Sequence, residues 1–518
     1  MSSPARPRAT RPADPAPPPG TSPPIAPPRP VCLPLRRRRR IQQRNTAMST
    51  TTAPAAEHAQ ADPYALRPED ARPAPTVFRD RIRHLGPGFV LSAAVVGSGE
   101  LITTTALGAE AGFALLWLVI VSTAVKVWVQ MELAQWTILN GRTALEGYRD
   151  VGPRIGRLSW INWLWIGMDF AKMFQRGGII GGTAAACSVL WPVIGEPLSW
   201  GSLALWAVVV TLAAVLLLQS GKYSLVERAC LVSVVVFTLV TVSLAVGLPG
   251  TEFGYGGSEL GSGFGFEIPA GTVGIALAVF GITGVGADEM TTYTYWCMEK
   301  GYARWTGPDD GSEERARRAE GWIKVMRLDA LTGLAVCVLC TLSFYVIGAA
   351  VLHPQGLVPE GNEMITTLSR IYTDTMGPWA EYLFLIGAFA VLFSTLIGST
   401  ASVPRLWTNT LGLLGVIDWG DVRVRTRTIR VLTWCLPLLW ACFFLWMQSP
   451  VLMVQIGGIG GGIFLLAVVV AVWRLRSTGV PRRFRANPWL TGALVVSSAA
   501  ILCVGVYGVL KTLGAVPE

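Results

Sequence analysis

Apolar residues along this chain fall into eleven stretches of about 20 residues or more, separated by short polar segments. A helix needs about 20 predominantly apolar residues to cross the hydrocarbon core of a bilayer. The pattern therefore predicts an all-α, polytopic membrane protein. We expect spans at about 87–110, 113–138, 159–190, 202–219, 224–248, 271–302, 328–352, 379–402, 429–448, 451–473 and 488–510.

Two of the expected spans are interrupted by a short glycine-rich segment that carries acid. The breaks are Gly97-Ser98-Gly99-Glu100 in span 1 and Gly284-Val285-Gly286-Ala287-Asp288-Glu289 in span 6. A carboxylate inside a membrane costs roughly 2.5–3.5 kcal/mol, so it is normally retained for a purpose. Corresponding breaks in two halves of a transporter indicate an inverted repeat with the substrate between the broken helices. We therefore expect spans 1–5 and 6–10 to form a 5+5 inverted repeat, with an eleventh helix appended.

The basic residues predict how the spans are oriented. The chain carries a net charge of +10, and with the N-terminus in the cytoplasm almost all Lys and Arg residues of the loops fall on the cytoplasmic side. The outer loops then hold Arg370 alone, before the short tail with Lys511. This asymmetry follows the positive-inside rule. It predicts a multi-pass protein of the cell (plasma) membrane with its C-terminus outside, and it accounts for the basic charge without a nucleic-acid partner.

Residues 1–76 are rich in Pro, Ala and Arg and too poor in apolar residues to bury a core. We expect them to form a disordered cytoplasmic tail before a transmembrane transporter domain at 77–518. The run Arg36 to Arg40 fits contact with anionic lipid or nucleic acid. A translation start at Met48, which would remove these arginines from the protein, fits the sequence equally well.

Span 1 opens on Gly86-Pro87-Gly88-Phe89-Val90-Leu91-Ser92, followed by the break, by Gly108 and Gly112, and by the apolar run 115–130. These residues resemble the first two spans of the natural resistance-associated macrophage protein (Nramp) family of divalent metal transporters, and similarity in broad pattern extends from about residue 80 to 475. The resemblance implies a LeuT-type fold. It also implies a secondary-active transporter of divalent metal cations, in which the cation is the substrate and no cofactor is needed, and not an enzyme.

This chain departs from the family at the expected metal ligands. The family's Asp-Pro-Gly-Asn motif aligns with Gly97-Ser98-Gly99-Glu100, and its Met-Pro-His motif aligns with Asp288-Glu289-Met290. Carboxylate and carbonyl oxygens suit Mg²⁺, Ca²⁺ and Mn²⁺, whereas thioether and imidazole suit softer metals. We therefore expect Mn²⁺ or Mg²⁺ ahead of Fe²⁺. The candidate metal site consists of Glu100, Asp288 and Glu289 with the backbone at Gly97 and Gly284.

Several of these charges allow a second interpretation. The three acids also fit the start of a half-helix, where the macrodipole favours negative charge. In span 3, Asp169, Lys172 and Arg176 are spaced three and four apart and share one helix face. In the family an Asp and a Glu at the first two of these positions resemble a proton path, so the group is either a proton path or gate or a buried ion pair. Lys126 and Glu132 in span 2 are likewise a gate or a structural pair.

Two other functions remain open from the residues. The same fold could carry an organic cation or amine, with Tyr293, Tyr295 and Trp296 as an aromatic wall beside the acids. A non-transporting ion sensor would use the cytoplasmic loop 300–327 as its output surface. The run Gly457 to Gly462 in span 10 fits either close helix packing or a bend during transport. Proton coupling, the direction of transport and the oligomeric state are left open by the sequence.

Overall fold

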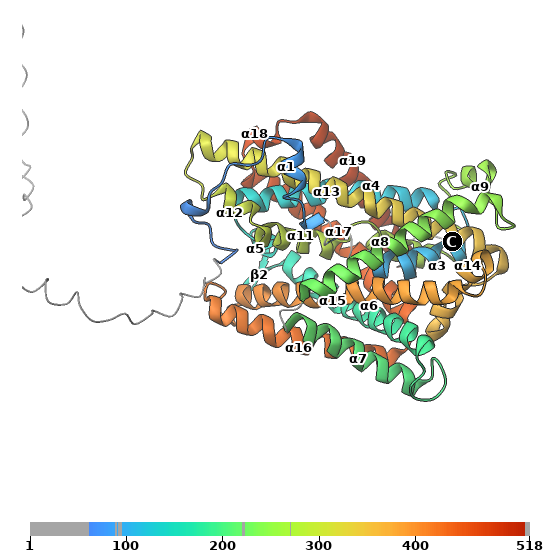
Figure 1. The fold of residues 1–518 in the computed structure, drawn as a ribbon. Coiled ribbons are helices and arrows are strands. Elements are labelled where there is room, and N and C mark those ends of the chain that lie inside the picture. The colour runs from blue at the N-terminus through green and yellow to red at the C-terminus, as the bar shows by residue number, and fades with distance from the viewer. Residues whose placement is uncertain (1–61, 89–90, 92–95, 220–222, 270, 513–518) are drawn as a thin grey trace, which may run out of the picture. The chain divides into compact units, whose positions relative to one another are not determined.

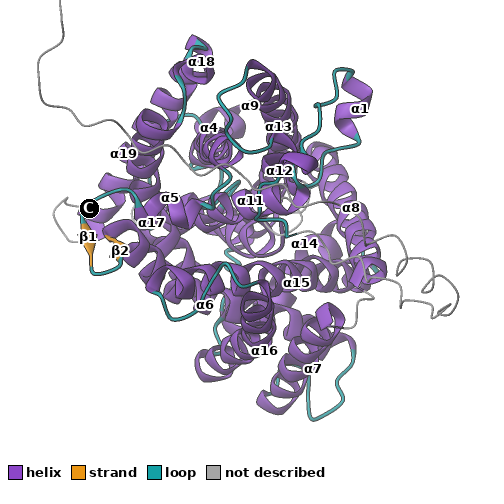
Figure 2. Ribbon diagram, turned by 90° about the vertical axis from the view of Figure 1, so that its left-hand side faces the viewer, coloured by secondary structure: helices purple, strands orange, loops and turns teal. Residues whose placement is uncertain are grey.

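Every expected span corresponds to a helix in the computed structural model, which describes residues 62–512 except 89–90, 92–95, 220–222 and 270 (Figure 1). Among the described residues, eight helices are long and apolar enough to cross a membrane, judged by length and composition. Figure 2 shows most of the long helices end-on, with α11 (Ala287–Lys300) in the middle and the others around it. The tail up to residue 61, with Arg36 to Arg40 and Met48, lies outside the described residues.

The first half of the helical region contains spans 1–5 and their connections. Span 1 consists of the π-helix η2 (Val96–Thr104) and the α-helix α3 (Thr105–Ala111). The next four spans are α4 (Leu116–Asn140), α6 (Trp160–Leu190), α7 (Trp200–Gln219) and α8 (Tyr223–Gly247). The shorter elements are η1 (Pro68–Asp70), α1 (Phe78–Ile82), α5 (Ala144–Arg149), the antiparallel pair β1 (Arg154–Ile155) and β2 (Leu158–Ser159), η3 (Leu248–Gly250) and α9 (Gly257–Ser262).

The second half contains spans 6–10 and the eleventh helix. Span 6 consists of α10 (Val273–Ile282) and α11, and the next spans are α13 (Glu313–Ile347), α15 (Ala380–Leu414), α16 (Val422–Met447), α17 (Pro450–Gly479) and α19 (Pro488–Thr512). The shorter elements are α12 (Tyr302–Thr306), the π-helix η4 (Gly348–Leu352), η5 (His353–Gln355), η6 (Gly361–Glu363), α14 (Met364–Met376) and α18 (Arg482–Arg485).

The break predicted in span 6 is confirmed. Helix α10 ends at Ile282 and α11 begins at Ala287, so four residues between them leave the helical path. Gly284 has a φ of 70°, a backbone conformation that glycine adopts at no steric cost. The break thus frees backbone groups in the interior of the helical bundle.

Span 1 differs from the expectation over the part that is described. Gly97 and Glu100 lie inside η2, a wide helical winding, and not in an open break. Threonine hydroxyls support this winding: Thr104 Oγ1 donates to Gly99 O at 3.0 Å, and Thr105 Oγ1 donates to Glu100 O at 3.3 Å. Short π-helical stretches inside α-helices are frequent at functional sites.

Span 7 begins earlier than its apolar stretch indicates. We expected a loop over 300–327, but this segment contains α12 and the first turns of α13. The side chain of Ser312 caps α13 by accepting from Arg315 N at 3.0 Å, and Glu314 pairs with Arg318 one turn later at 2.7 Å. Capping and pairs spaced four apart stabilise a polar helix without burial in lipid.

Glycines bring three helices close together beside the break. A Cβ atom on Gly281 of α10 would collide with the Gly458 carbonyl of α17, and one on Gly458 would meet the Ala278 carbonyl. On another face of α17, Gly457 and Gly460 lie against α6. Small residues allow such backbone approach in membrane helices. The packing interpretation of the run Gly457 to Gly462 is therefore confirmed.

We had expected residues 62–76 to belong to a disordered tail. Instead, they bind across one end of the bundle. Asp62 pairs with Arg425 of α16 at 2.5 Å, and the Tyr64 hydroxyl donates to Glu299 of α11 at 2.7 Å. Farther along, Arg72 N donates to Trp305 O at 2.8 Å. This N-terminal segment thus contacts three helices of the second half, α11, α12 and α16.

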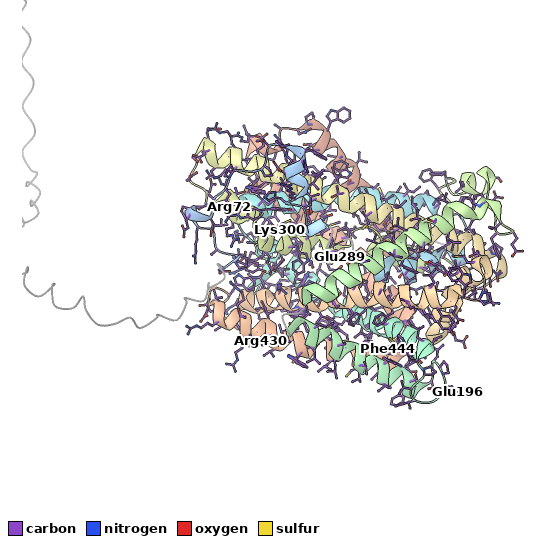
Figure 3. All side chains as sticks on the ribbon, viewed as in Figure 1. Arg72, Glu196, Glu289, Lys300, Arg430 and Phe444 are labelled. Atoms are coloured by element: carbon purple, nitrogen blue, oxygen red, sulfur yellow. The ribbon has the colours of Figure 1, made fainter. Side chains whose placement is uncertain are left out.

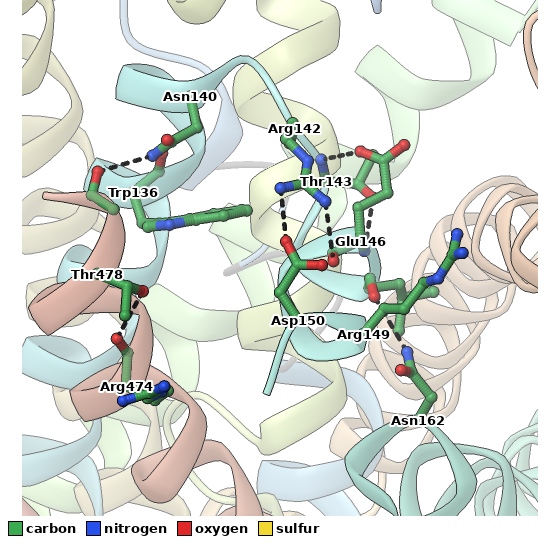
Figure 4. A network of polar contacts seen from close by, with 12 residues as sticks. Trp136, Asn140, Arg142, Thr143, Glu146, Arg149, Asp150, Asn162, Arg474 and Thr478 are labelled. Atoms are coloured by element: carbon green, nitrogen blue, oxygen red, sulfur yellow. Dashed lines mark hydrogen bonds and ion pairs between the residues drawn. The ribbon is translucent and has the colours of Figure 1, made fainter. Parts of the chain in front are cut away.

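The turn between α4 and α6 is held by a polar network (Figure 4). Thr143 and Glu146 form a reciprocal capping box at the start of α5. Arg142 pairs with Asp150 at 2.6 Å and donates to Glu146 O at 3.2 Å. A capping box satisfies two backbone donors at once and so stabilises the start of the helix.

Candidate functional site

The first turn of α11 and the middle of α6 form a cluster of ion pairs next to the break. Lys172 Nζ lies 2.8 Å from Asp288 Oδ1 and 3.8 Å from Glu289 Oε1. The Lys172 side chain is 1% exposed, whereas those of Asp288 and Glu289 are 15% and 18% exposed. One ammonium group therefore faces two carboxylates that still touch open space.

Arg176 links this cluster to the other acid of span 3. Its Nη1 lies 2.8 Å from Asp169 Oδ1, and its Nη2 lies 3.7 Å from Asp288 Oδ2. The Trp407 indole donates to Asp169 Oδ2 at 2.6 Å, and the guanidinium lies 5.3 Å from the centre of the Trp440 ring. Buried charges are tolerated when they are paired and hydrogen-bonded in this way.

A cavity of about 50 Å³ opens onto the cluster. This volume holds one or two water molecules. Figure 3 shows Glu289 among the helices, whereas Glu196 lies in the peripheral loop after α6. Charged groups, hydroxyls, one amide and one indole line the cavity. Its polar or aromatic lining residues are Lys172, Gln175, Arg176, Asp288, Glu289, Thr292, Trp296, Thr395, Ser399 and Ser402.

Glu100 is not among the residues that line this cavity. Its side chain is fully buried. Oε1 accepts from the Gly284 backbone amide at 3.3 Å, and Oε2 accepts from Thr104 Oγ1 at 3.1 Å. Glu100 therefore binds an amide of the span 6 break, whereas we had expected a carbonyl near Gly284 to join it as a ligand.

Helix α4 satisfies the carbonyl that the break sets free. Lys126 Nζ donates to Thr283 O at 2.7 Å, and Ser122 Oγ lies 2.6 Å from Thr283 Oγ1. Ser122 and Lys126 are four residues apart and so share one face of α4. The sequence offered Glu132 of the same span as a possible partner for Lys126, and it gave no sign of the Thr283 carbonyl.

The predicted site residues thus separate into two groups. Asp288 and Glu289 lie in the first turn of α11, as the helix N-terminus interpretation requires, and they also face the cavity. Glu100 and the break at Gly284 form the second group, and Gly97 lies in η2 near Glu100. Among the described residues, no group of three or more His, Cys, Asp and Glu side chains is arranged to hold a metal ion.

Two expected pairings need correction. The predicted ion pair within span 3 forms between Asp169 and Arg176, but Lys172 reaches across to α11 instead. In span 2, Lys126 and Glu132 are not partners, because Glu132 binds Arg476 of α17 at 2.6 Å. The partners missed by the sequence lie more than a hundred residues away along the chain, and no local spacing indicates them.

A family model described as "Natural resistance-associated macrophage protein-like" matches residues 88–511. The divalent metal cation transporter MntH of Deinococcus radiodurans is 25% identical over 328 residues, which cover 63% of this chain and 69% of that protein. Metal transporter Nramp3 of Arabidopsis thaliana is 34% identical over 128 residues, which cover 25% of this chain and 23% of that protein.

Solved structures share the arrangement of helices. A mutant of the Eremococcus coleocola manganese transporter superposes with a TM-score of 0.61 at 14% identity, covering 88% of this chain and 93% of that one. Mhp1, a nucleobase-cation-symport-1 family transporter in a closed conformation, gives a TM-score of 0.51 at 15% identity, covering 87% and 97%. These likenesses confirm the predicted LeuT-type fold.

Proposed function

The chain belongs to the natural resistance-associated macrophage protein-like (Nramp) family, and we propose that it is a secondary-active transporter of divalent metal cations that works by alternating access. The observation that carries this proposal is the family match over residues 88–511, which includes the broken span 6 and its two acids. MntH and the Eremococcus protein are named as a divalent metal and a manganese transporter, respectively.

We place the cargo cation at Asp288 and Glu289, the acids that face the cavity. The side chains of Thr292, Ser399 and Ser402 line the same cavity, so these uncharged residues offer hydroxyl oxygens to the cation. Oxygen ligands suit Mn²⁺ and Mg²⁺ better than softer ions. A divalent ion brings twice the charge of the Lys172 ammonium, so it can displace that ammonium from Asp288 when the site is open.

The proposal also includes the orientation of the protein in the membrane and the roles of the residues beside the cavity. We place the protein in the plasma membrane with its N-terminus in the cytoplasm and its C-terminus outside, because loop Lys and Arg residues are so unevenly distributed. Glu100 holds the break through the Gly284 amide and completes the site as a neighbouring negative charge. Asp169 and Arg176 support Asp288 through their ion pair.

The contacts that two tyrosines of α11 make with other helices weaken the alternative that the substrate is an organic cation. Tyr293 donates to Asp329 at 2.8 Å and Tyr295 donates to Asn409 at 2.6 Å, and both rings are buried away from the cavity. Only Trp296 of the expected aromatic wall lines the cavity. The cavity volume of about 50 Å³ also suits a metal ion better than an amine with a carbon skeleton.

Flux into proteoliposomes tests the proposal. Purified protein is reconstituted, and uptake of Mn²⁺, Mg²⁺, Ca²⁺ and Fe²⁺ is measured with and without a pH gradient, which also shows whether protons are coupled. We expect Asp288→Asn and Glu289→Gln to reduce Mn²⁺ uptake at least tenfold. Glu196→Gln, at an exposed acid of the peripheral loop, is the matched control and should keep wild-type uptake.

Three results would contradict the proposal. Wild-type protein that moves none of the four ions is not a divalent cation transporter, and if it still binds them it is a sensor. Competition by amines but not by metals would favour the organic-cation alternative. Equal uptake by wild type and Asp288→Asn would place the cargo elsewhere.

A further inference from the structure

One face of α11 carries a row of polar or aromatic side chains from the cavity to the last turn of the helix. Residues spaced three or four apart share a helix face. The row consists of Glu289, Thr292, Trp296 and Glu299. All of these except Glu299 line the cavity. The row therefore continues one step beyond the cavity, toward the end of α11 at Lys300.

Helix α15 presents a second row to the same cavity. Its members are again spaced three or four residues apart, and they are Thr395, Ser399, Ser402 and Arg405. The three hydroxyl residues line the cavity, and Arg405 does not. The two rows thus face each other across the cavity, and each has one further member, which is charged.

These two charged members bind each other and close the space between the rows. Arg405 Nε donates to Glu299 Oε1 at 2.7 Å, and the guanidinium lies 5.5 Å from the centre of the Trp296 ring. The Tyr64 hydroxyl donates to the same Glu299 oxygen at 2.7 Å. The closure therefore lies directly beyond the cavity wall formed by Trp296, at the end of the bundle that the N-terminal segment crosses.

This ion pair is better suited to opening than the pairs beside the cargo. The side chains of Arg405 and Glu299 are 27% and 22% exposed, whereas those of Arg176 and Asp169 are 6% and 2% exposed. Ion pairs that water reaches contribute little to stability. Pro404 lies inside α15 next to Arg405 and has no backbone N–H to donate within the helix. Helices bend at such prolines, so the last turns of α15 can move away from α11.

We propose that the space between α11 and α15 is the path by which the cargo cation leaves the cavity, and that Glu299, Arg405 and Trp296 form the gate that closes it. This inference rests on the proposed function and adds to it the route of the cargo. The proposed orientation places the gate on the cytoplasmic side. When Arg405 moves away, the Glu299 carboxylate becomes an oxygen ligand for the departing cation.

The test measures how fast a thiol behind the gate reacts in purified full-length protein. Ser402→Cys places this thiol in the cavity wall, one turn before Arg405, and a charged methanethiosulfonate reagent modifies it. We expect Glu299→Gln and Arg405→Gln each to raise the rate about tenfold or more, because the rate follows the population of the open conformation. Exchanging the charges by Glu299→Arg with Arg405→Glu restores the pair, and the rate should return to within about threefold of that of Ser402→Cys alone.

Two controls separate opening of the gate from loss of structure. Glu320→Gln makes the same chemical change at an ion pair within α13, where Glu320 lies 2.9 Å from Lys324, and it should leave the rate unchanged. Peptide mass spectrometry follows each native thiol separately. Cys187 of α6 is buried and does not line the cavity, so it should react as slowly in the gate variants as in wild type.

The gate and the proposed function fail in different ways. Wild type that moves no divalent ion in proteoliposomes contradicts the proposed function, whatever the thiol rates are. Gate variants in which the thiol reacts no faster than with Glu320→Gln overturn the gate. The gate is also overturned if the exchanged charges do not restore the slow rate, or if Cys187 reacts faster as well, because the helices would then have loosened generally.

Discussion

Replacing Lys172 by Met should destabilise the empty protein and make its stability depend on divalent cations. The ammonium lies 2.8 Å from Asp288, which at an effective dielectric constant near 20 corresponds to an attraction of about 6 kcal/mol. Desolvation of the two charges offsets part of this attraction. Removing one partner of a buried pair costs about 3–5 kcal/mol, because the other charge is left unpaired.

The expected change is measurable as a thermal shift. A protein of 150–250 residues loses roughly 2–4 °C per kcal/mol, and a larger one loses less, so we expect Lys172→Met to lower Tm by about 3–10 °C. Saturating Mn²⁺ should recover much of this loss, because a ligand at 100 times its dissociation constant adds about 2.7 kcal/mol. Wild type should gain less, since there the cation must first displace Lys172.

Lys324→Met is the matched control. Lys324 forms an ion pair with Glu320 at 2.9 Å, but its side chain is 52% exposed, and exposed pairs contribute about 0–1 kcal/mol. The reasoning about the buried pair is refuted if both variants shift Tm equally. It is also refuted if Mn²⁺ raises Tm no more in Lys172→Met than in wild type.

Three further predictions concern the scaffold. Asp329→Asn loses part of a clamp that accepts from the amides of Gly86 and Gly88 and from a tyrosine hydroxyl, and it should cost about 1–3 kcal/mol in thermal or denaturant unfolding. Gly281→Ala should cost a similar 1–3 kcal/mol through overpacking against α17, seen as a lower Tm without a change in which ions are carried. Tyr64→Phe should cost about 1 kcal/mol and speed proteolysis of the N-terminal segment, whereas Tyr382→Phe, at a 64% exposed position, should change neither.

The sequence predicted the spans well because crossing a membrane imposes a length and a composition on each helix. Expected and observed ends agree closely for α4, α6, α7, α8 and α19. They differ most for α13 and α15, which continue past the apolar stretch. The first turns of α13 are stabilised by a cap and charge pairs, which hydropathy does not register. The last turns of α15 are buried against other helices through contacts such as those of Trp407 and Asn409.

The candidate site was predictable as to its residue types but not as to its contacts. Gly284, Asp288 and Glu289 were recognisable because glycine and acid are unusual in an apolar span. That Lys172 binds the first turn of α11, whereas Lys126 binds the break itself, depends on how α4 and α6 are placed relative to span 6. Such partners are chosen by tertiary packing, which the spacing of residues within one helix does not contain.

The N-terminal segment 62–76 couples whatever precedes it to the helices. Asp62 holds α16 and Tyr64 holds α11, so a motion that separates these two helices must break one of the contacts. Coupling free energies are reciprocal. A factor that binds the chain before residue 62 and pulls on it would therefore shift the equilibrium between helix conformations, and those conformations would change the binding free energy of the factor by the same amount. A fluorophore attached near Tyr64 would therefore report any separation of α11 from α16.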